Sequence, residues 1–198
     1  MNNMRKFVVC SLAAALAVGA AFAKEECERK EFPVALALLP AVEWPSADYD
    51  ILGLRFGLLA SEHRSASLLD INLIAAFTPG EELGLQLTGF YNRIGEGAGV
   101  LQLAGLANDC RGDFTGGQVS AFYNRADGTV SGVSIGALNM ADGLHGIQVG
   151  IVNRVKTLEG LQVGVVNYAN EAEGLQVGVI NVMRDGKYPV MPIANFGF

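Results

Sequence analysis

The sequence repeats one eight-residue phrase three times, as Gly146-Ile-Gln-Val-Gly-Ile-Val-Asn153, Gly160-Leu-Gln-Val-Gly-Val-Val-Asn167 and Gly174-Leu-Gln-Val-Gly-Val-Ile-Asn181. Weaker copies stand upstream, and the closing asparagine marks each of them. It recurs at Asn92, Asn108, Asn124, Asn139, Asn153, Asn167 and Asn181, with intervals of 16, 16, 15, 14, 14 and 14 residues. Such regular recurrence predicts a tandem array of one structural unit.

Two further positions recur together with the asparagine. A small residue stands three positions before it, as Gly89, Gly105, Ala121, Gly136, Gly150, Gly164 and Gly178. A glutamine precedes the small residue in all copies but one, as Gln86, Gln102, Gln118, Gln148, Gln162 and Gln176, with Ser134 in the remaining copy. We call these three sets the Gln, Gly and Asn positions of the frame and expect them to have a structural role.

Each copy has the composition of a strand that ends in a turn. Its residues are rich in β-branched and aliphatic side chains and alternate with small or polar ones, as strands do. Polar, Gly-containing turns such as Ala141-Asp-Gly143 separate the copies. A unit of 14 to 16 residues has no room for a helix beside its strand. The sequence therefore predicts an all-β fold.

Two all-β architectures fit the tandem 14–16-residue repeats: a β-solenoid, in which each repeat is one coil, and an antiparallel β-meander or outer-membrane-type β-barrel. The spacing between the Gln and Gly positions favours the solenoid. It is three residues at Gln86 and Gly89 but two at Gln148 and Gly150. One inserted residue reverses every later side chain of a continuous strand, whereas the corner of a coil absorbs it. A glycine there suits a positive φ or a close neighbour, and stacked asparagines can bond to one another.

The end of the chain favours the barrel instead. Val190, Pro192, Ala194, Phe196 and Phe198 alternate up to a terminal aromatic residue, as in the last strand of outer-membrane barrels. A barrel would also require this strand to pair with the similar stretch Phe32-Pro-Val-Ala-Leu-Ala-Leu-Leu-Pro40. Against it, the apolar run of each copy is short for a strand that crosses a membrane. The solenoid is the leading prediction.

Degenerate copies extend the array towards the N-terminus. Gly53-Leu-Arg-Phe-Gly-Leu-Leu-Ala60 keeps the frame, with Arg55 at the Gln position and Ala60 at the Asn position. The stretch from Ser67 to Phe77 is expected to form one strand that has lost the markers. The predicted division is a signal peptide at 1–23, an N-terminal segment with one strand at 24–50, the β-repeat array at 51–187 and a C-terminal strand at 188–198.

The first 23 residues have the layout of a secretory signal peptide. Arg5 and Lys6 precede an apolar run, and Ala21 and Ala23 stand where a signal peptidase cuts. An uncleaved membrane anchor is the alternative. Cleavage would leave 12 basic against 20 acidic residues, a net charge of about −8, which argues against binding to nucleic acid. Export would permit a disulfide between Cys27 and Cys110, and two free thiols are the alternative.

Signatures of catalysis are weak. His63 and His145 lie in no metal-ligand or triad spacing, and both are expected to be surface residues. Acidic residues fall singly in turns and predict a solvated face. Arg111-Gly-Asp113, an adhesion tripeptide elsewhere, lies where the repeat already requires a turn. We therefore predict no enzyme activity, no catalytic, metal-binding or cofactor-binding residues, and no cofactor.

The Gly-Leu-Gln-Val-Gly-Val-Val-Asn copies, the leader and the ending Tyr188-Pro-Val-Met-Pro-Ile-Ala-Asn-Phe-Gly-Phe198 resemble the bacterial surface-repeat proteins first named from leptospires. The resemblance covers roughly residues 32–198 and is weakest over residues 49–77. It implies an exported or surface-associated protein, of the periplasm, outer membrane or cell surface, whose biochemical role is unknown. Because the frame residues serve the backbone and the packing of repeats and build no site, we expect a structural or interaction role in the cell envelope. The partner is unknown, and another envelope protein or the outer membrane are the candidates. A small outer-membrane barrel acting as anchor or pore is the alternative function.

Overall fold

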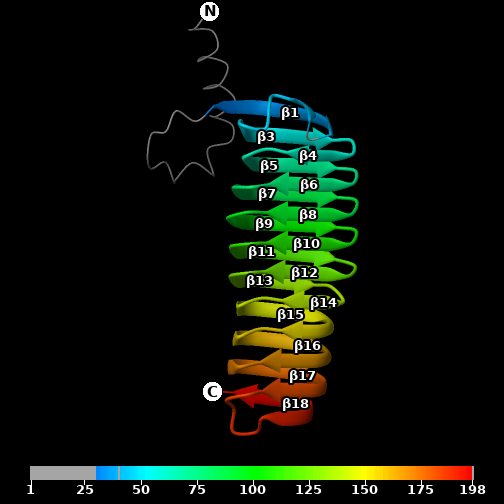
Figure 1. Ribbon diagram of the computed structural model, residues 1–198. Coiled ribbons are helices and arrows are strands. Elements are labelled where there is room, and N and C mark those ends of the chain that lie inside the picture. Colours follow the sequence, from blue (N-terminus) through cyan, green and yellow to red (C-terminus); the bar gives the residue numbers. More distant parts are fainter. Residues whose placement is uncertain (1–29, 40, 198) are drawn as a thin grey trace, which may run out of the picture.

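The computed structural model describes residues 30–39 and 41–197, which form a straight column of about 10 stacked coils (Figure 1). Like strands of successive coils pair in parallel, and equivalent residues of the repeat are register partners. The predicted β-solenoid is therefore confirmed. The alternative, an antiparallel meander or an outer-membrane-type barrel, is wrong for this fold.

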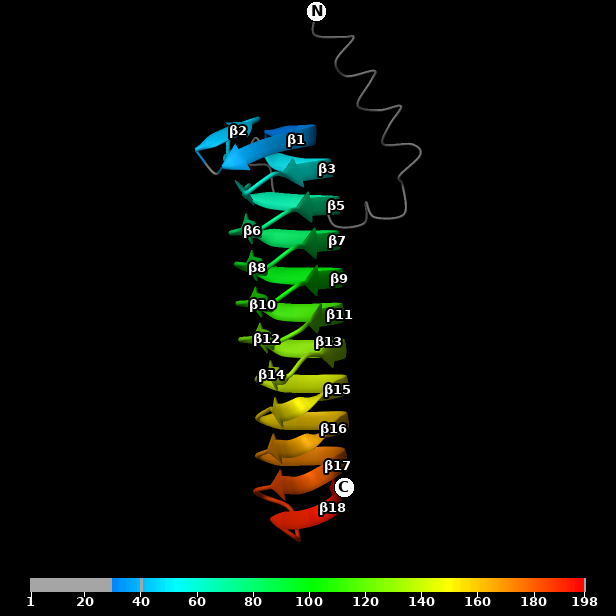
Figure 2. The same cartoon turned by 90° about the vertical axis from the view of Figure 1, so that its right-hand side faces the viewer.

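Most coils consist of one long and one short strand (Figure 2). The long strands are β1 (Glu31–Leu39), β3 (Asp50–Gly57), β5 (Ser65–Asn72), β7 (Glu81–Thr88), β9 (Gly97–Ala104), β11 (Asp113–Ser120) and β13 (Thr129–Ile135). The short strands are β2 (Val42–Trp44), β4 (Ala60–Glu62), β6 (Ala75–Thr78), β8 (Tyr91–Ile94), β10 (Ala107–Cys110), β12 (Tyr123–Ala126) and β14 (Leu138–Met140). In the later coils one strand continues through both faces, as β15 (Gly143–Arg154), β16 (Thr157–Ala169) and β17 (Glu171–Met183), before β18 (Val190–Gly197).

Antiparallel strands close both ends of the column. At the N-terminal end β2 folds back on β1, so the segment before Asp50 contains two strands where the sequence predicts one. At the C-terminal end β18 folds back on β17. The stretches that would have paired in a barrel thus lie at opposite ends of the molecule (Figure 1). These antiparallel strands end the stacking of parallel coils, as terminal units that differ from the repeat do in other repeat proteins.

The asparagines of the frame form a buried ladder through the column. Nδ2 of Asn92 donates to Oδ1 of Asn108 at 2.9 Å, and the same bond is repeated from coil to coil as far as Asn181, at 2.8–2.9 Å. Each Nδ2 also donates to a main-chain carbonyl oxygen on the long strand that follows it, such as Val163 O for Asn153. Both ends of these buried amides are therefore satisfied, as burial requires.

The glutamines form a second ladder, in which each side chain donates its hydrogen bond to the preceding coil instead of the next one. Nε2 of Gln102 donates back to Oε1 of Gln86, and Gln118 donates back to Gln102, at 2.8–2.9 Å. The same bonds join Gln176, Gln162 and Gln148 at 2.8–3.0 Å. Ser134 interrupts the ladder, and Oε1 of Gln118, which is buried, has no hydrogen-bond partner.

The degenerate upstream copies follow the same columns with different residues. Arg55 and Asp70 lie in register with Gln86, so the placement of Arg55 at the Gln position is confirmed. The Asn position of that copy is Ser61, not Ala60, because the wider corner holds one more residue. The stretch from Ser67 to Phe77 belongs to two strands, β5 and β6, instead of one.

The two glycines of each phrase serve different purposes. The first has a positive φ in two of the three phrases, 150° at Gly146 and 141° at Gly160, and there it bends the long strand before the glutamine. The second, as in Gly150, lies where the preceding coil passes so close that a Cβ would overlap the carbonyl oxygen of Gly136. The Gly position of the frame therefore reflects close approach of two backbones, one of the two reasons expected from the sequence.

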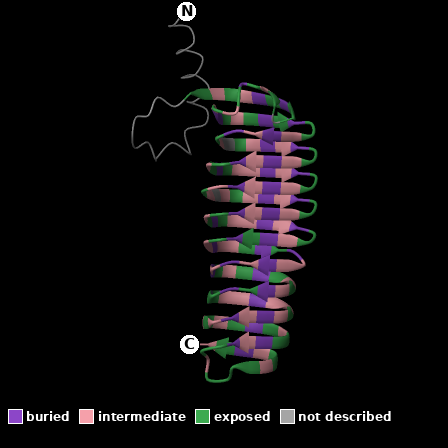
Figure 3. Cartoon of the chain, viewed as in Figure 1, coloured by how far each residue is buried: buried purple, intermediate pink, exposed green. Residues whose placement is uncertain are grey.

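An apolar core lies beside the amide ladders (Figure 3). It is built from one buried side chain near the start of each long strand, as in Phe114, and one near the end of each short strand, as in Ile94. Its members are Ile94, Cys110, Phe114, Ala126, Val130, Ala141, Leu144, Val155, Leu158, Ala169 and Met183.

The gap in the glutamine ladder yields a stability prediction. Ser134→Gln places an amide in register between Gln118 and Gln148, where it can donate to the unpartnered Oε1 of Gln118. We expect the free energy of unfolding to rise by about 1 kcal/mol, the net value of one buried hydrogen bond. Urea denaturation monitored by circular dichroism measures it. A drop in stability would show that the coil at Ser134 has no room for the longer side chain.

Candidate interaction surface

Two columns of aliphatic side chains flank the Gln position on the outer face of the long strands. Because side chains alternate along a strand, the residues before and after a buried glutamine both point outwards. The column before it runs in register through Val34, Leu54, Leu69, Leu85, Leu101, Gly117, Val133, Ile147, Leu161, Leu175 and Phe196. The column after it runs through Leu36, Phe56, Ile71, Leu87, Leu103, Val119, Ile135, Val149, Val163, Val177 and Ala194.

A third apolar column lines the corner that leads into the short strands. Its members are Leu59, Ile74, Phe90, Leu106, Phe122, Ala137, Ile151, Val165 and Val179, and the side chains of Phe122 and Val179 are 62% and 64% exposed. We call the three columns together the apolar stripe. It carries no charged residue and no polar side chain from one end cap to the other.

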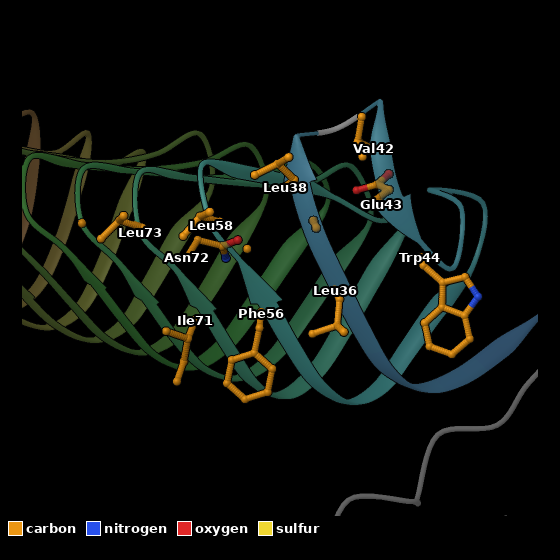
Figure 4. Close-up of a pocket in the computed structure, with 13 residues that line it drawn as sticks. Leu36, Leu38, Val42, Glu43, Trp44, Phe56, Leu58, Ile71, Asn72 and Leu73 are labelled. Carbon is orange, nitrogen blue, oxygen red and sulfur yellow. The ribbon is translucent and has the colours of Figure 1, made fainter.

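Shallow grooves run between the second and third columns. The Gly positions of the frame form their floor, and one groove of about 570 Å³ has Leu87 and Leu103 on its wall above Gly89 and Gly105. A larger groove of about 820 Å³ lies at the N-terminal end. There Leu36, Phe56 and Ile71 stand in a row on one side, with Leu38, Leu58 and Leu73 opposite (Figure 4).

The stripe is larger than the apolar patches usual on monomeric proteins. Eleven strands at about 4.8 Å spacing give a length of roughly 50 Å, and about five residues across give a width of roughly 15 Å. The resulting area of roughly 750 Å² exceeds the ~300–600 Å² of the largest patch on a typical monomer. Patches of this size mark contact surfaces.

The opposite edge of the coil is polar. Its turns hold exposed ion pairs between neighbouring coils, such as Lys156 with Asp142 at 2.7 Å. Beside the turns, His145 on β15 lies 3.4 Å from Glu159 on β16. Arg111 and Asp113 lie at such a turn, where Asp113 Oδ1 accepts a hydrogen bond from the main-chain nitrogen of Thr129 at 2.7 Å. This edge is the solvated face that the sequence predicts, and the solenoid as a whole is amphipathic.

A buried ionic cluster replaces the amides at the N-terminal end. The guanidinium of Arg55 makes two hydrogen bonds to the carboxylate of Asp70, one of them 2.7 Å from Nε to Oδ1, and both side chains are fully buried. Gln86 donates to Asp70 at 2.9 Å, which joins the glutamine ladder to the ion pair. Burial lowers the pKa of Arg55, but the combined effect of Asp70, Glu82 and Glu43 raises it by more, so the guanidinium stays charged.

Glu82 is the second acid of this cluster. Its Oε2 accepts a hydrogen bond from Thr78 at 3.0 Å and lies 3.6 Å from Nη2 of Arg55, whereas Oε1 has no partner. Burial raises the pKa of Glu82 to about 8, although Arg55 acts in the opposite direction. One guanidinium thus neutralises Asp70, and Glu82 is held mainly in its neutral form.

The prediction that both histidines are surface residues is wrong for His63. Its ring is fully buried under the N-terminal cap, with Nε2 3.2 Å from the carbonyl of Pro45 and Nδ1 3.8 Å from Glu43. Burial lowers its pKa to about 4. The burial of His63 could not be predicted from the repeat, because the cap that covers this residue is not part of it. His145 is exposed as expected.

Of the two cysteines that could pair, Cys110 is buried in the apolar core, and burial raises the pKa of its thiol to about 11. Cys27 lies outside the described residues, as do the predicted signal peptide and its predicted cleavage site. The disulfide therefore stays a prediction.

The structure brings the sequence-predicted frame residues together as ladders inside the column, where they are closed to solvent. Among the residues described, no group of His, Cys, Asp and Glu is arranged to hold a metal ion. Nor does any helix in residues 30–39 and 41–197 have the length and apolar character needed to cross a membrane. Comparison with models of known families, with curated proteins and with solved structures gives no match. The apolar stripe is the surface that the sequence analysis missed.

The ionic cluster predicts how the stability of the fold depends on pH. The raised pKa of Glu82 means that the folded state holds its proton more tightly, so stability falls as pH rises from 4.5 to about 8. The lowered pKa of His63 acts oppositely, but only between about 4 and 6.5. Above pH 6.5 the effect of Glu82 stands alone, and we expect stability to decrease up to about pH 8.

Glu82→Gln is the matched variant, because it keeps the shape and removes the titration. Its denaturation midpoint should change little between pH 6.5 and 8.5, whereas that of the unmodified protein should fall. Equal pH dependence of the two proteins would assign the titration to another group.

Proposed function

We propose that the protein is an exported component of the bacterial cell envelope or surface with a structural or interaction role, and that it acts through the apolar stripe. The run of apolar residues over eleven strands, with no charged or polar side chain among them, carries this proposal. The apparent leader at residues 1–23 and the resemblance to leptospiral-type surface repeats support export.

Exposure of the apolar stripe to water is unfavourable in free energy unless another surface covers it. Apolar surface exposed to water is unfavourable by about 25 cal/mol for each Å², so contact with another apolar surface stabilises the stripe, and part of that gain offsets the entropy lost on association. A chain with a polar edge and buried polar ladders could have carried polar side chains at these outer positions without disturbing the interior. Their aliphatic character therefore supports a binding role.

We also propose that the protein is not an enzyme. The repeated polar side chains bond to one another inside the column, as Asn153 does with Asn139 and Asn167. The ionic cluster around Arg55 and Asp70 is fully buried and has no access to a substrate. The polar groups that reach solvent are spread along the column, in turns as with Lys156 and Asp142 or on strands as with His145 and Glu159.

Cell fractionation tests the proposal. The native chain should lose residues 1–23, as shown by intact mass, and should be recovered with the envelope or outside the cell. The double variant Ile135→Lys/Val149→Lys places two charges in the stripe, and its retention by the envelope should fall by roughly tenfold or more, because an unpaired charge in a contact costs several kcal/mol.

The matched control is Ser131→Lys/His145→Lys, which adds the same charges four residues earlier on the same strands, β13 and β15. It should behave as the native protein does. Recovery of the uncleaved chain from the cytosol would contradict export, and equal retention of the two double variants would contradict a role for the stripe.

A further inference from the structure

We propose that the apolar stripe is a homodimer interface, in which two copies of this chain pack face to face about a two-fold axis that passes through the coil of Gly117 and Val119. This inference rests on the proposed function, since it names the partner of the same surface. Four properties of the stripe favour a second copy: its area, its shape, its charge and its gradient of side-chain size.

The area is that of a stable dimer. Two stripes of roughly 750 Å² would bury about 1,500 Å² in total, within the ~1,200–2,000 Å² of specific protein–protein interfaces. Apolar cores are also more typical of homodimers than of transient contacts.

The shape suits a second copy because the column is straight. The long strands stack without a visible accumulated twist from β3 to β17 (Figure 2). Two untwisted sheets can touch along their whole length, at the ~10 Å spacing of packed sheets. Each stripe presents one side chain per ~4.8 Å along the column, and only a surface with the same spacing can interdigitate with it throughout.

The charge argues against an anionic lipid surface. The chain has a formal net charge of −6, and the stripe has no lysine or arginine among its members. Helices and sheets that lie on membranes carry basic residues that bind lipid headgroups. A second uncharged stripe fits this face better.

Side-chain size changes from one end of the stripe to the other. The column after the Gln position begins with Leu36 and Phe56 and ends with Val177 and Ala194, whereas the column before it begins with Val34 and ends with Phe196. Parallel copies would set large against large and small against small. Antiparallel copies set large against small and keep the two sheets evenly spaced.

The centre of this arrangement is marked in the sequence. Five strands of the stripe precede the strand of Gly117 and Val119, and five follow it. Gly117 is the one position of the stripe without a side chain. On the two-fold axis, the Gly117 residues of both copies meet, and the absence of a side chain lets the faces approach there. Val149 lies two strands after this centre and Leu87 lies two strands before it. The two-fold axis therefore places Val149 of one copy opposite Leu87 of the other.

The test begins with the molar mass of the purified protein by analytical ultracentrifugation between 1 and about 100 μM, a range that separates μM dimers from monomers. We expect a dimer. Val149→Lys and Leu87→Glu should each weaken it by roughly a hundredfold or more, because each buries a lone charge twice in the dimer. The controls His145→Lys and Leu83→Glu lie four residues earlier on the same strands and should leave the dimer intact.

Mixing the two stripe variants tests the two-fold axis. If Val149 faces Leu87, the mixture should form a heterodimer, since an introduced lysine then meets an introduced glutamate. In a parallel dimer these positions do not meet, and the mixture stays monomeric, which would overturn the proposed axis. Circular dichroism spectra equal to those of the native protein show that the variants are folded.

A native protein that is monomeric at 100 μM would overturn the homodimer. Flotation of this monomer with phosphatidylcholine vesicles, lost in Val149→Lys, would assign the stripe to lipid. Retention by the envelope that depends on the stripe, without dimerisation, would assign it to another envelope protein. In both cases the proposed function would stand while this inference fails.

Discussion

The hydrogen bond from each frame asparagine to the asparagine of the next coil determines the path of the chain, because each coil must bring its asparagine back to the same ladder. Because Nδ2 of one lies 2.8–2.9 Å from Oδ1 of the next, a coil can change its length only outside the ladder columns. The column uses this freedom. Between the 16-residue and the 14-residue coils, one residue is lost between the Gln and Asn positions and one at the polar turn, and both ladders stay in register.

The same constraint produces the apolar exterior. A strand that points its glutamine inwards must point both neighbours outwards, so the phrase Gly160-Leu-Gln-Val-Gly164 places an amide inside and two aliphatic side chains outside. The interior gains hydrogen-bonded specificity, since a slip by one residue would break every amide bond at once. Hydrophobic surface that an ordinary core would bury is left on the outer face, where another surface can cover it.

The sequence predicts the columns and their chemistry because recurrence at fixed spacing determines which residues stack. It predicts Arg55 at the Gln position for this reason, but it misplaces the Asn position as Ala60, since one additional corner residue moves the column to Ser61. The burial of His63 depends on β2, which lies outside the repeat. The stripe was missed because alternation along a strand does not show which of the two sets of side chains faces solvent.

The end caps determine what kind of association this fold permits. An uncapped solenoid exposes strand edges at both ends and can grow into fibres through backbone hydrogen bonds. Here β2 and β18 turn back antiparallel on the end strands, so the ends do not present the parallel frame of a further coil. This interrupts the stacking of coils at both ends and favours association through the side chains of the apolar face. The polar edge, with its paired Lys156 and Asp142, stays hydrated on the far side. A flat face of limited length that carries no charge favours a closed pair over an open chain, because once two stripes cover each other no apolar column is left to recruit a third.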